Sequence, residues 1–145
     1  IPLRLVGSEM CIRDRPMIDR FLATRYLKGG RGPVDVDCYG LVRLARVELF
    51  DKPWMPLCVD ASPGDMRAIT KAVSEVAAMA NMRETVAMPG SIATAWRASL
   101  CVHVGIVAEA DGRLWVLETD EPTGPCLTPI SDFERRYTKV AYYAD

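Results

Sequence analysis

The chain has 145 residues, of which 50% are hydrophobic and 26% are charged, a composition typical of one globular domain. The net charge of −1 gives no basic excess that would favour nucleic acid or an anionic membrane surface. No apolar run approaches the roughly 18 residues that a transmembrane helix needs. We therefore expect no nucleic-acid partner and no membrane association.

The first sixteen residues differ from the rest of the chain. They read IPLRLVGSEMCIRDRP and begin without methionine, and the part VGSEMCIRDR resembles the translation of a sequencing adapter. We interpret residues 1–16 as a non-native leader, exclude them from the fold and expect a single domain over residues 17–145. The alternative is an ordinary N-terminal tail, and under either interpretation Cys11 has no role.

Apolar residues recur at helical spacing twice in the first third of the chain. Ile18 and Phe21 belong to a pattern that predicts a short helix over 18–26, and the glycine-rich stretch 28–36 predicts a loop. A second pattern starts at Asp37, a residue type that caps helix N-termini. It predicts a helix that ends at the prolines of DKPWMPL and carries these residues on one face: Cys38, Leu41, Val42, Ala45 and Leu49.

The second half of the chain predicts one more long helix and then strands. The stretch DMRAITKAVSEVAAMANM has neither glycine nor proline and predicts a helix near 64–81. Asp111-Gly112 is a strong signal for a two-residue hairpin turn. The other expected elements are strands over 91–96, 101–110, 113–119 and 138–144, a loop over 121–125 and a helical turn over 132–137. Helices followed by an antiparallel sheet define an α+β fold.

The five cysteines are widely spaced and form no CxxC pair, and His103 is the only histidine. The odd number and the wide spacing argue against a disulfide framework. A zinc site would need several thiolates from scattered positions. We therefore expect free thiols in a reducing compartment, no bound metal and no cofactor.

Cys38 stands apart because it lies where a loop turns into a helix. Unpaired backbone N–H groups and the helix dipole favour negative charge there, so the position favours the nucleophilic thiolate. A nucleophilic thiol also needs a base, and His103, in the strand over 101–110, is the sole histidine that could serve. The alternative, which spacing alone favours, is that both are ordinary core residues.

Several segments, taken in order, resemble the NlpC/P60 cysteine peptidases encoded in the tail genes of phages and prophages. The likeness extends over residues 18–145 and rests on these segments: RYLKGG, DCYGLVRL, PGS, HVGIV, the Asp-Gly hairpin and VAYYAD. It implies a papain-like fold, in which the cysteine begins a helix that packs on an antiparallel sheet carrying the histidine. It also implies cleavage of amide bonds in peptidoglycan stem peptides, synthesis in the bacterial cytoplasm and association with phage tail proteins.

The resemblance assigns roles to three residues. It makes Cys38 the nucleophile and His103 the base, and it places Tyr26 in the oxyanion region, where a plain packed aromatic is the alternative. Two positions depart from the common pattern of the family. Ser91 stands where an aspartate is frequent, and Tyr39 stands where bacterial members often carry serine, which fits the phage-type subgroup.

The group that orients the base is not given by the resemblance, because the family often uses a second histidine there. A two-residue turn at Asp111-Gly112 pairs Ala110 with Arg113, and strand alternation then puts Val116, Glu118 and Asp120 on the face of His103. Val116 cannot accept a hydrogen bond. We favour Glu118, with Asp120 as the second choice and a solvated surface position as the alternative for both.

Two other functions remain open at this point. One is a structural tail-assembly protein on the same fold, with weak or no hydrolysis, which the missing second histidine favours. The other is acyl transfer through the same thioester chemistry, since one fold hosts several activities.

Overall fold

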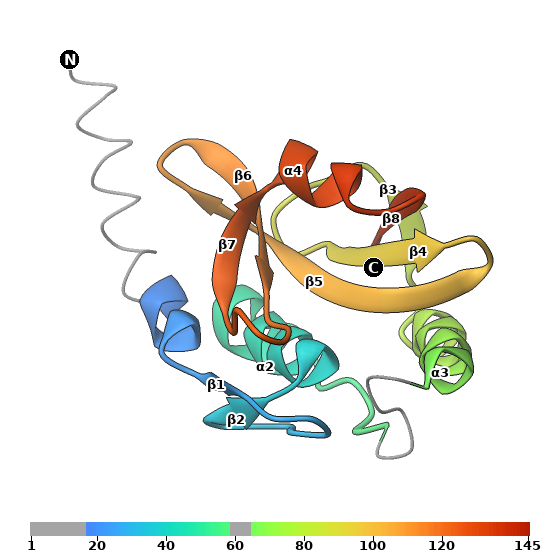
Figure 1. The fold of residues 1–145 in the computed structure, drawn as a ribbon, viewed down its shortest axis with the longest axis horizontal. Helices are drawn as coiled ribbons and strands as arrows, with labels where there is room; N and C mark the ends of the chain where they lie inside the picture. Colours follow the sequence, from blue (N-terminus) through green and yellow to red (C-terminus); the bar gives the residue numbers. More distant parts are fainter. Residues whose placement is uncertain (1–16, 59–64) are drawn as a thin grey trace.

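The computed structural model describes residues 17–58 and 65–145 (Figure 1). The proposed leader, residues 1–16, lies outside the described residues. The described chain has the expected α+β architecture. A six-stranded antiparallel sheet has the order β3-β8-β4-β5-β6-β7, and helices lie on both of its faces.

The N-terminal part departs from the prediction. Residues 17–22 are helical, but the helix stops there, and β1 (Arg25–Tyr26) pairs in parallel with β2 (Asp35–Val36). The expected helix over 18–26 is therefore too long, and the stretch 28–36 is not entirely loop. The physical reason is pairing: the backbone N–H groups of Arg25 and Leu27 donate to the carbonyls of Val34 and Val36, which overrides the helical spacing.

Helix α2 (Cys38–Phe50) begins where the sequence predicts. The Asp37 carboxylate accepts hydrogen bonds from the backbone N–H of Gly40 at 2.8 Å and of Gly29 at 3.1 Å, and from Arg31 Nη1 at 2.6 Å. One residue thus caps the helix and ties it to the glycine loop. A Cβ at Gly40 would lie 2.2 Å from the Gly30 carbonyl oxygen, so the loop approaches the first turn this closely only because position 40 is glycine.

The sheet confirms the expected hairpin and adds two strands. β5 (Leu100–Ala110) and β6 (Arg113–Glu118) pair in the predicted register, with Ala110 opposite Arg113. The other strands are β3 (Arg83–Thr85), β4 (Ile92–Arg97), β7 (Cys126–Pro129) and β8 (Lys139–Ala144). The short edge strands β3 and β7 were not predicted, because three or four residues carry little periodic signal.

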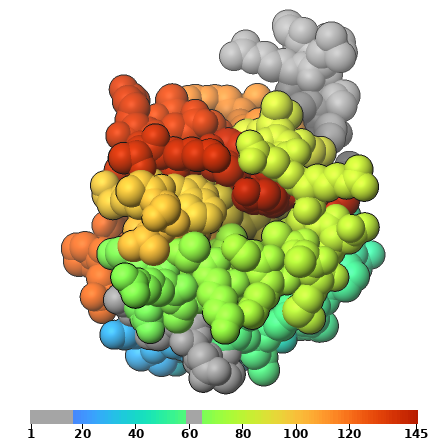
Figure 2. All heavy atoms as spheres, turned by 90° about the vertical axis from the view of Figure 1, so that its right-hand side faces the viewer, coloured from blue at the N-terminus to red at the C-terminus, as the bar shows by residue number. Residues whose placement is uncertain are grey.

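Two helices cover one face of the sheet and one short helix covers the other. α2 and α3 (Met66–Met79) pack against β4 and β5 through a continuous apolar core, and Figure 2 shows α3 (green) below these strands (yellow). α4 (Ile130–Arg135) packs on the opposite face through Phe133. The site described next uses the start of α2, the middle of the sheet and α4.

Candidate active site

Cys38 is the first residue of α2 and is 7% exposed. Its position follows from the capping of the helix by Asp37, which fixes where the first turn starts. The first turn of a helix presents N–H groups without intrahelical partners, and the helix dipole adds positive potential there. The thiol therefore lies where a negative charge on sulfur is stabilised.

His103 lies in β5, opposite Ala95 of β4, and is 2% exposed. Its Nε2 atom is 2.9 Å from Glu118 Oε1. Burial alone would lower the pKa of His103, but the influence of the nearby Cys38 thiol and then of Glu118 outweighs it and raises that pKa to about 10. Since Glu118 takes Nε2, the nitrogen left for the thiol is Nδ1.

Glu118 ends β6 and is buried beside the imidazole. Arg136 Nη2 lies 2.7 Å from both of its carboxylate oxygens, and the Thr128 hydroxyl donates to Oε2. Burial alone would raise the pKa of Glu118, yet the hydrogen bonds from His103, Arg136 and Thr128 lower it to about 2. The carboxylate is therefore ionised at neutral pH and holds the ring through Nε2.

A glycine allows β6 to approach the histidine strand this closely. A Cβ at Gly105 would lie 2.4 Å from Val116 Cγ1 and 3.1 Å from the Leu117 carbonyl oxygen, and it would contact Glu118 Cβ at 3.5 Å. A side chain at this position would displace the Val116 side chain and press on the Leu117 carbonyl. The absence of a side chain at Gly105 thus lets β6 pack closely on the strand that carries His103.

Aromatic rings support the imidazole from the α4 side. The ring of His103 is stacked on Tyr137 at 6.3 Å and tilted against Phe133 at 6.0 Å, measured between centroids. The guanidinium of Arg136 lies over both of these rings, at 5.1 Å from Phe133 and 5.4 Å from Tyr137. Packing therefore fixes the orientation of the ring as well as its hydrogen bonds.

Tyr26 and Asp120 lie at the edge of this group. Burial, the charge of Asp120 and then that of Cys38 raise the pKa of the Tyr26 hydroxyl to about 12, so the phenol is neutral and close to the thiol. Asp120 is exposed, and its Oδ2 lies 4.0 Å from His103 Nδ1. The structure thus brings Cys38, His103 and Glu118 together and leaves Asp120 beyond hydrogen-bonding distance of the ring.

Sequence reasoning missed Thr128 and Arg136. Thr128 lies in β7, which gave no periodic signal, and Arg136 directly follows α4 among several charged residues. Arg136 adds a second cation to the His103 ring beside this carboxylate, and buried charges are stabilised by such pairing.

The other cysteines of the described chain lie in different surroundings. Burial raises the pKa of the Cys101 thiol to about 12. Cys58 Sγ lies 3.7 Å from the Tyr39 hydroxyl, and Cys126 Sγ lies 3.6 Å from that of Thr128. Within residues 17–58 and 65–145 these thiols are unbridged, and no three or more histidine, cysteine and acidic side chains converge as metal ligands.

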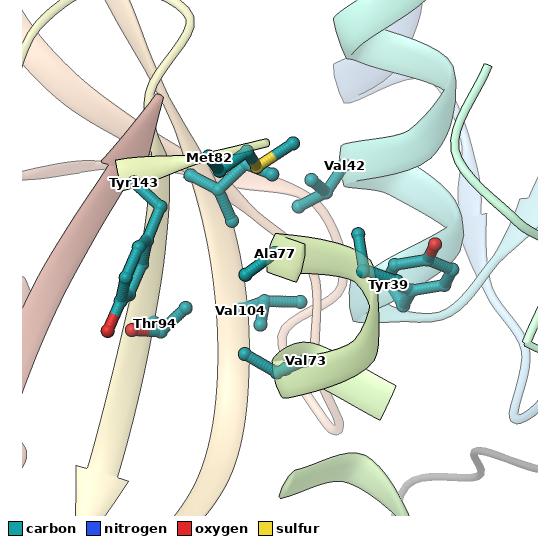
Figure 3. A pocket seen from close by; sticks show the side chains of 10 residues that line it. Tyr39, Val42, Val73, Ala77, Met82, Thr94, Val104 and Tyr143 are labelled. Atoms are coloured by element: carbon teal, nitrogen blue, oxygen red, sulfur yellow. The ribbon is translucent and has the colours of Figure 1, made fainter. Parts of the chain in front are cut away.

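An apolar hollow lies beside the candidate active site, between α2, α3 and the sheet (Figure 3). Its volume is about 30 Å³, and Tyr39, Val73 and Val104 separate it from a gap of about 20 Å³ that reaches Cys38. Spaces of this size hold about one or two water molecules at most, and apolar ones stay dry. They are packing gaps and do not admit a peptide substrate.

No protein-family model matches the sequence. No curated protein matches it either. None of the helices in the described part of the chain combines the length and the apolar character needed to cross a bilayer. The chemistry of the site is therefore argued from its own geometry.

Proposed function

We propose that the protein is a cysteine peptidase of the NlpC/P60 type, with a papain-like arrangement of helix and sheet, that cleaves amide bonds in peptidoglycan stem peptides. The observation that carries the proposal is the buried His103 ring held by Glu118 at 2.9 Å, together with Cys38 at the start of α2, close enough to influence the pKa of that ring. Nucleophile, base and orienting group within hydrogen-bond reach of one another are the signature of covalent acyl-transfer catalysis.

In the proposed reaction the Cys38 thiolate attacks the carbonyl carbon of the scissile amide, while its proton resides on the His103 ring. The C–N bond then breaks, the ring gives that proton to the leaving amine, and an acyl thioester remains on Cys38. A water molecule, deprotonated by His103, attacks the thioester and releases the acid and the free thiol. Glu118 stabilises the imidazolium that exists before the amine leaves.

The oxyanion formed during attack needs donors that are already in place. The backbone N–H of Cys38 is one, because a first-turn amide has no carbonyl of its own helix to bind. The Tyr26 hydroxyl is the second, since its raised pKa keeps the proton on the phenol at neutral pH.

The biological setting of the proposal rests on the resemblance of the sequence motifs to tail-encoded members of the family. The protein would be made in the bacterial cytoplasm and assembled with phage or prophage tail proteins, and it would act on stem peptides during entry or assembly. The main departure from the pattern of the family is the orienting residue, which is Glu118 here and often a second histidine in the family.

A structural tail-assembly protein without strong hydrolysis is the second candidate. The low exposure of Cys38 and His103, 7% and 2%, favours it, because a substrate carbonyl must reach the sulfur. A peptidase needs the Tyr26 and Asp120 side to admit an extended peptide, whereas a structural protein does not.

Digestion of purified muropeptides, read by mass spectrometry, tests the proposal. The parent protein should release two new fragments from a stem peptide, and Cys38→Ala should release none while keeping the melting temperature. Cys58→Ala is the matched control, since Cys58 is a half-buried thiol that lies 3.7 Å from the Tyr39 hydroxyl and contacts neither His103 nor Glu118. Equal cleavage by Cys38→Ala and the parent would refute the nucleophile, and no cleavage by the parent would favour the structural candidate.

A further inference from the structure

A second hollow lies away from Cys38, where the segment after α2, the end of α3 and the end of β8 meet. It is an open groove of about 500 Å³, within the range of ligand-binding clefts. Its walls are apolar apart from two charged residues, and the residues that line it are Arg46, Pro53, Trp54, Met55, Pro56, Met79, Ala80 and Asp145.

Arg46 is the unusual residue of this groove. It lies in α2 and is 2% exposed. Its Nη2 is 3.4 Å from Asp145 Oδ2, a long contact, whereas Nε and Nη1 are buried and find no hydrogen-bond partner within residues 17–58 and 65–145. A buried guanidinium with so little compensation is unfavourable by itself. An anion beside Arg46 would accept hydrogen bonds from the guanidinium and balance its positive charge.

The charge around the groove is also unbalanced. Lys52 Nζ lies 3.2 Å from Asp145 Oδ1, and the guanidinium of Arg43 lies 4.4 Å from the centre of the Trp54 ring. Two cations therefore share one part-exposed carboxylate, and a third cation borders the aromatic wall. A ligand with a negative group is complementary to this arrangement.

The rim of the groove offers apolar surface to a ligand. Trp54 is 55% exposed and Met79 is 73% exposed. Tryptophan and arginine are the residue types that most often dominate binding energy at protein interfaces, and methionine adapts to the shape of a partner. An open groove with rigid prolines and such a rim suits an extended segment better than it suits a compact small molecule.

We propose that this groove binds a peptide segment of a partner protein that places one carboxylate between two apolar side chains. The carboxylate takes the place of Asp145 at Arg46 Nη2 and accepts a second hydrogen bond from Nε, which has no partner in the described chain, and the apolar side chains pack on Trp54 and Met79. Asp145 then pairs with Lys52 alone. The proposal does not depend on hydrolysis at Cys38, so a structural protein would use the groove equally well.

Titration followed by ¹⁵N NMR tests the proposal, with the peptide acetyl-Leu-Glu-Leu-amide as the probe. The Nε–H of Arg46 is buried and so exchanges slowly with water, which makes its signal observable. The probe should shift this signal and that of the Trp54 indole N–H. The matched peptide acetyl-Leu-Gln-Leu-amide should bind at least about tenfold more weakly, because it lacks the charge.

Variants distinguish specific binding in the groove from non-specific adsorption of the peptide to exposed apolar residues. Asp145→Asn should bind the glutamate peptide about two- to fivefold more tightly, as expected when a part-exposed competing ion pair is removed. Met79→Ala should weaken binding, whereas Met66→Ala, at the other end of α3 and also exposed, should not. Both methionines are exposed and contribute little to the hydrophobic core, so both variants should fold.

Four results would overturn the proposal. They are equal binding of the two peptides, no shift of Arg46 or Trp54 with the glutamate peptide, weaker binding by Asp145→Asn, and shifts with sodium acetate as large as those with the peptide. The last result would mean that the site takes a bare carboxylate and no peptide. Muropeptide cleavage, measured on the same samples, reports on Cys38 separately.

Discussion

The Nη2 atom of Arg136 lies 2.7 Å from both carboxylate oxygens of Glu118, the residue whose Oε1 atom binds the ring of His103. The guanidinium is about half exposed, whereas the carboxylate and the ring are buried. A surface cation therefore holds a buried anion, and that anion holds the imidazole. Arg136 touches no reacting atom and acts on catalysis only by positioning Glu118.

Replacing Arg136 tests this positioning role. Arg136→Met removes the charge but keeps the side chain over Phe133 and Tyr137, and it should lower kcat about tenfold with little change in KM. The pKa of Glu118 should rise without its cation, so the acidic limb of the kcat/KM profile should move to higher pH. Arg135→Met is the control, because within the described residues Arg135 pairs with the surface residue Asp132 and the carbonyl of Ser131 and does not contact Glu118. An unmoved acidic limb would show that Arg136 is merely structural.

The Glu118 carboxylate, at the end of β6, should matter more for catalysis than the carboxylate of Asp120, two residues further along the chain. A charge-assisted hydrogen bond contributes about 1.5–3 kcal/mol, so Glu118→Ala should lower kcat/KM on a stem peptide about tenfold to a hundredfold. Glu118→Gln can still accept a hydrogen bond and should lose less. Asp120→Ala should lose least, because Asp120 Oδ2 is 4.0 Å from the ring. A larger loss in Asp120→Ala than in Glu118→Ala would transfer the orienting role to Asp120.

The pH dependence of stability should reflect the buried pair. The pKa of Glu118 is lowered from 4.5 to about 2, so its contribution to the free energy of unfolding is complete above pH 4.5 and is lost as the pH falls to 2. The pKa of His103 is raised from 6.5 to about 10, so its contribution is complete below pH 6.5 and is lost as the pH rises to 10.

Urea unfolding at several pH values measures this dependence. The difference in free energy of unfolding between the parent and Glu118→Gln should be largest between pH 4.5 and 6.5 and should shrink on either side. A difference that stays constant from pH 2 to pH 10 would contradict the ionised pair.

Gly105 should tolerate no side chain. Gly105→Ala puts a Cβ 2.4 Å from Val116 Cγ1, and such overpacking costs about 1–3 kcal/mol of stability. Val116→Ala in the same chain should recover part of the loss, and a double-mutant cycle measures that coupling. Purely additive effects in the cycle would show that β6 does not approach β5 as closely as described.

Much of the fold could be predicted from the sequence because the relevant signals are local. A few adjacent residues specify each of several elements. Examples are the helix cap at Asp37, the hairpin turn at Asp111-Gly112 and the valine-rich strand around His103. The hairpin register followed from the turn alone. It placed Val116, Glu118 and Asp120 on the face of His103, and the lack of a hydrogen-bond acceptor in valine left the two carboxylates as candidates.

The rest depends on pairings between distant residues, which a single sequence does not display. Tyr26 lies in a strand because the chain ten residues later pairs with it. Thr128 and Arg136 reach Glu118 only after β7 and α4 have folded back over the sheet. Nothing in the local sequence around a threonine or an arginine indicates that its side chain will bind a distant carboxylate.

Alkylation of the individual cysteines at neutral pH tests the central claim most directly. Iodoacetamide labelling, followed for each cysteine peptide by mass spectrometry, should modify Cys38 fastest although it is only 7% exposed. Cys58 and Cys126 are more exposed and should react more slowly, and Cys101 should react last. Labelling of Cys38 no faster than that of Cys58 and Cys126 would contradict an activated nucleophile at the start of α2.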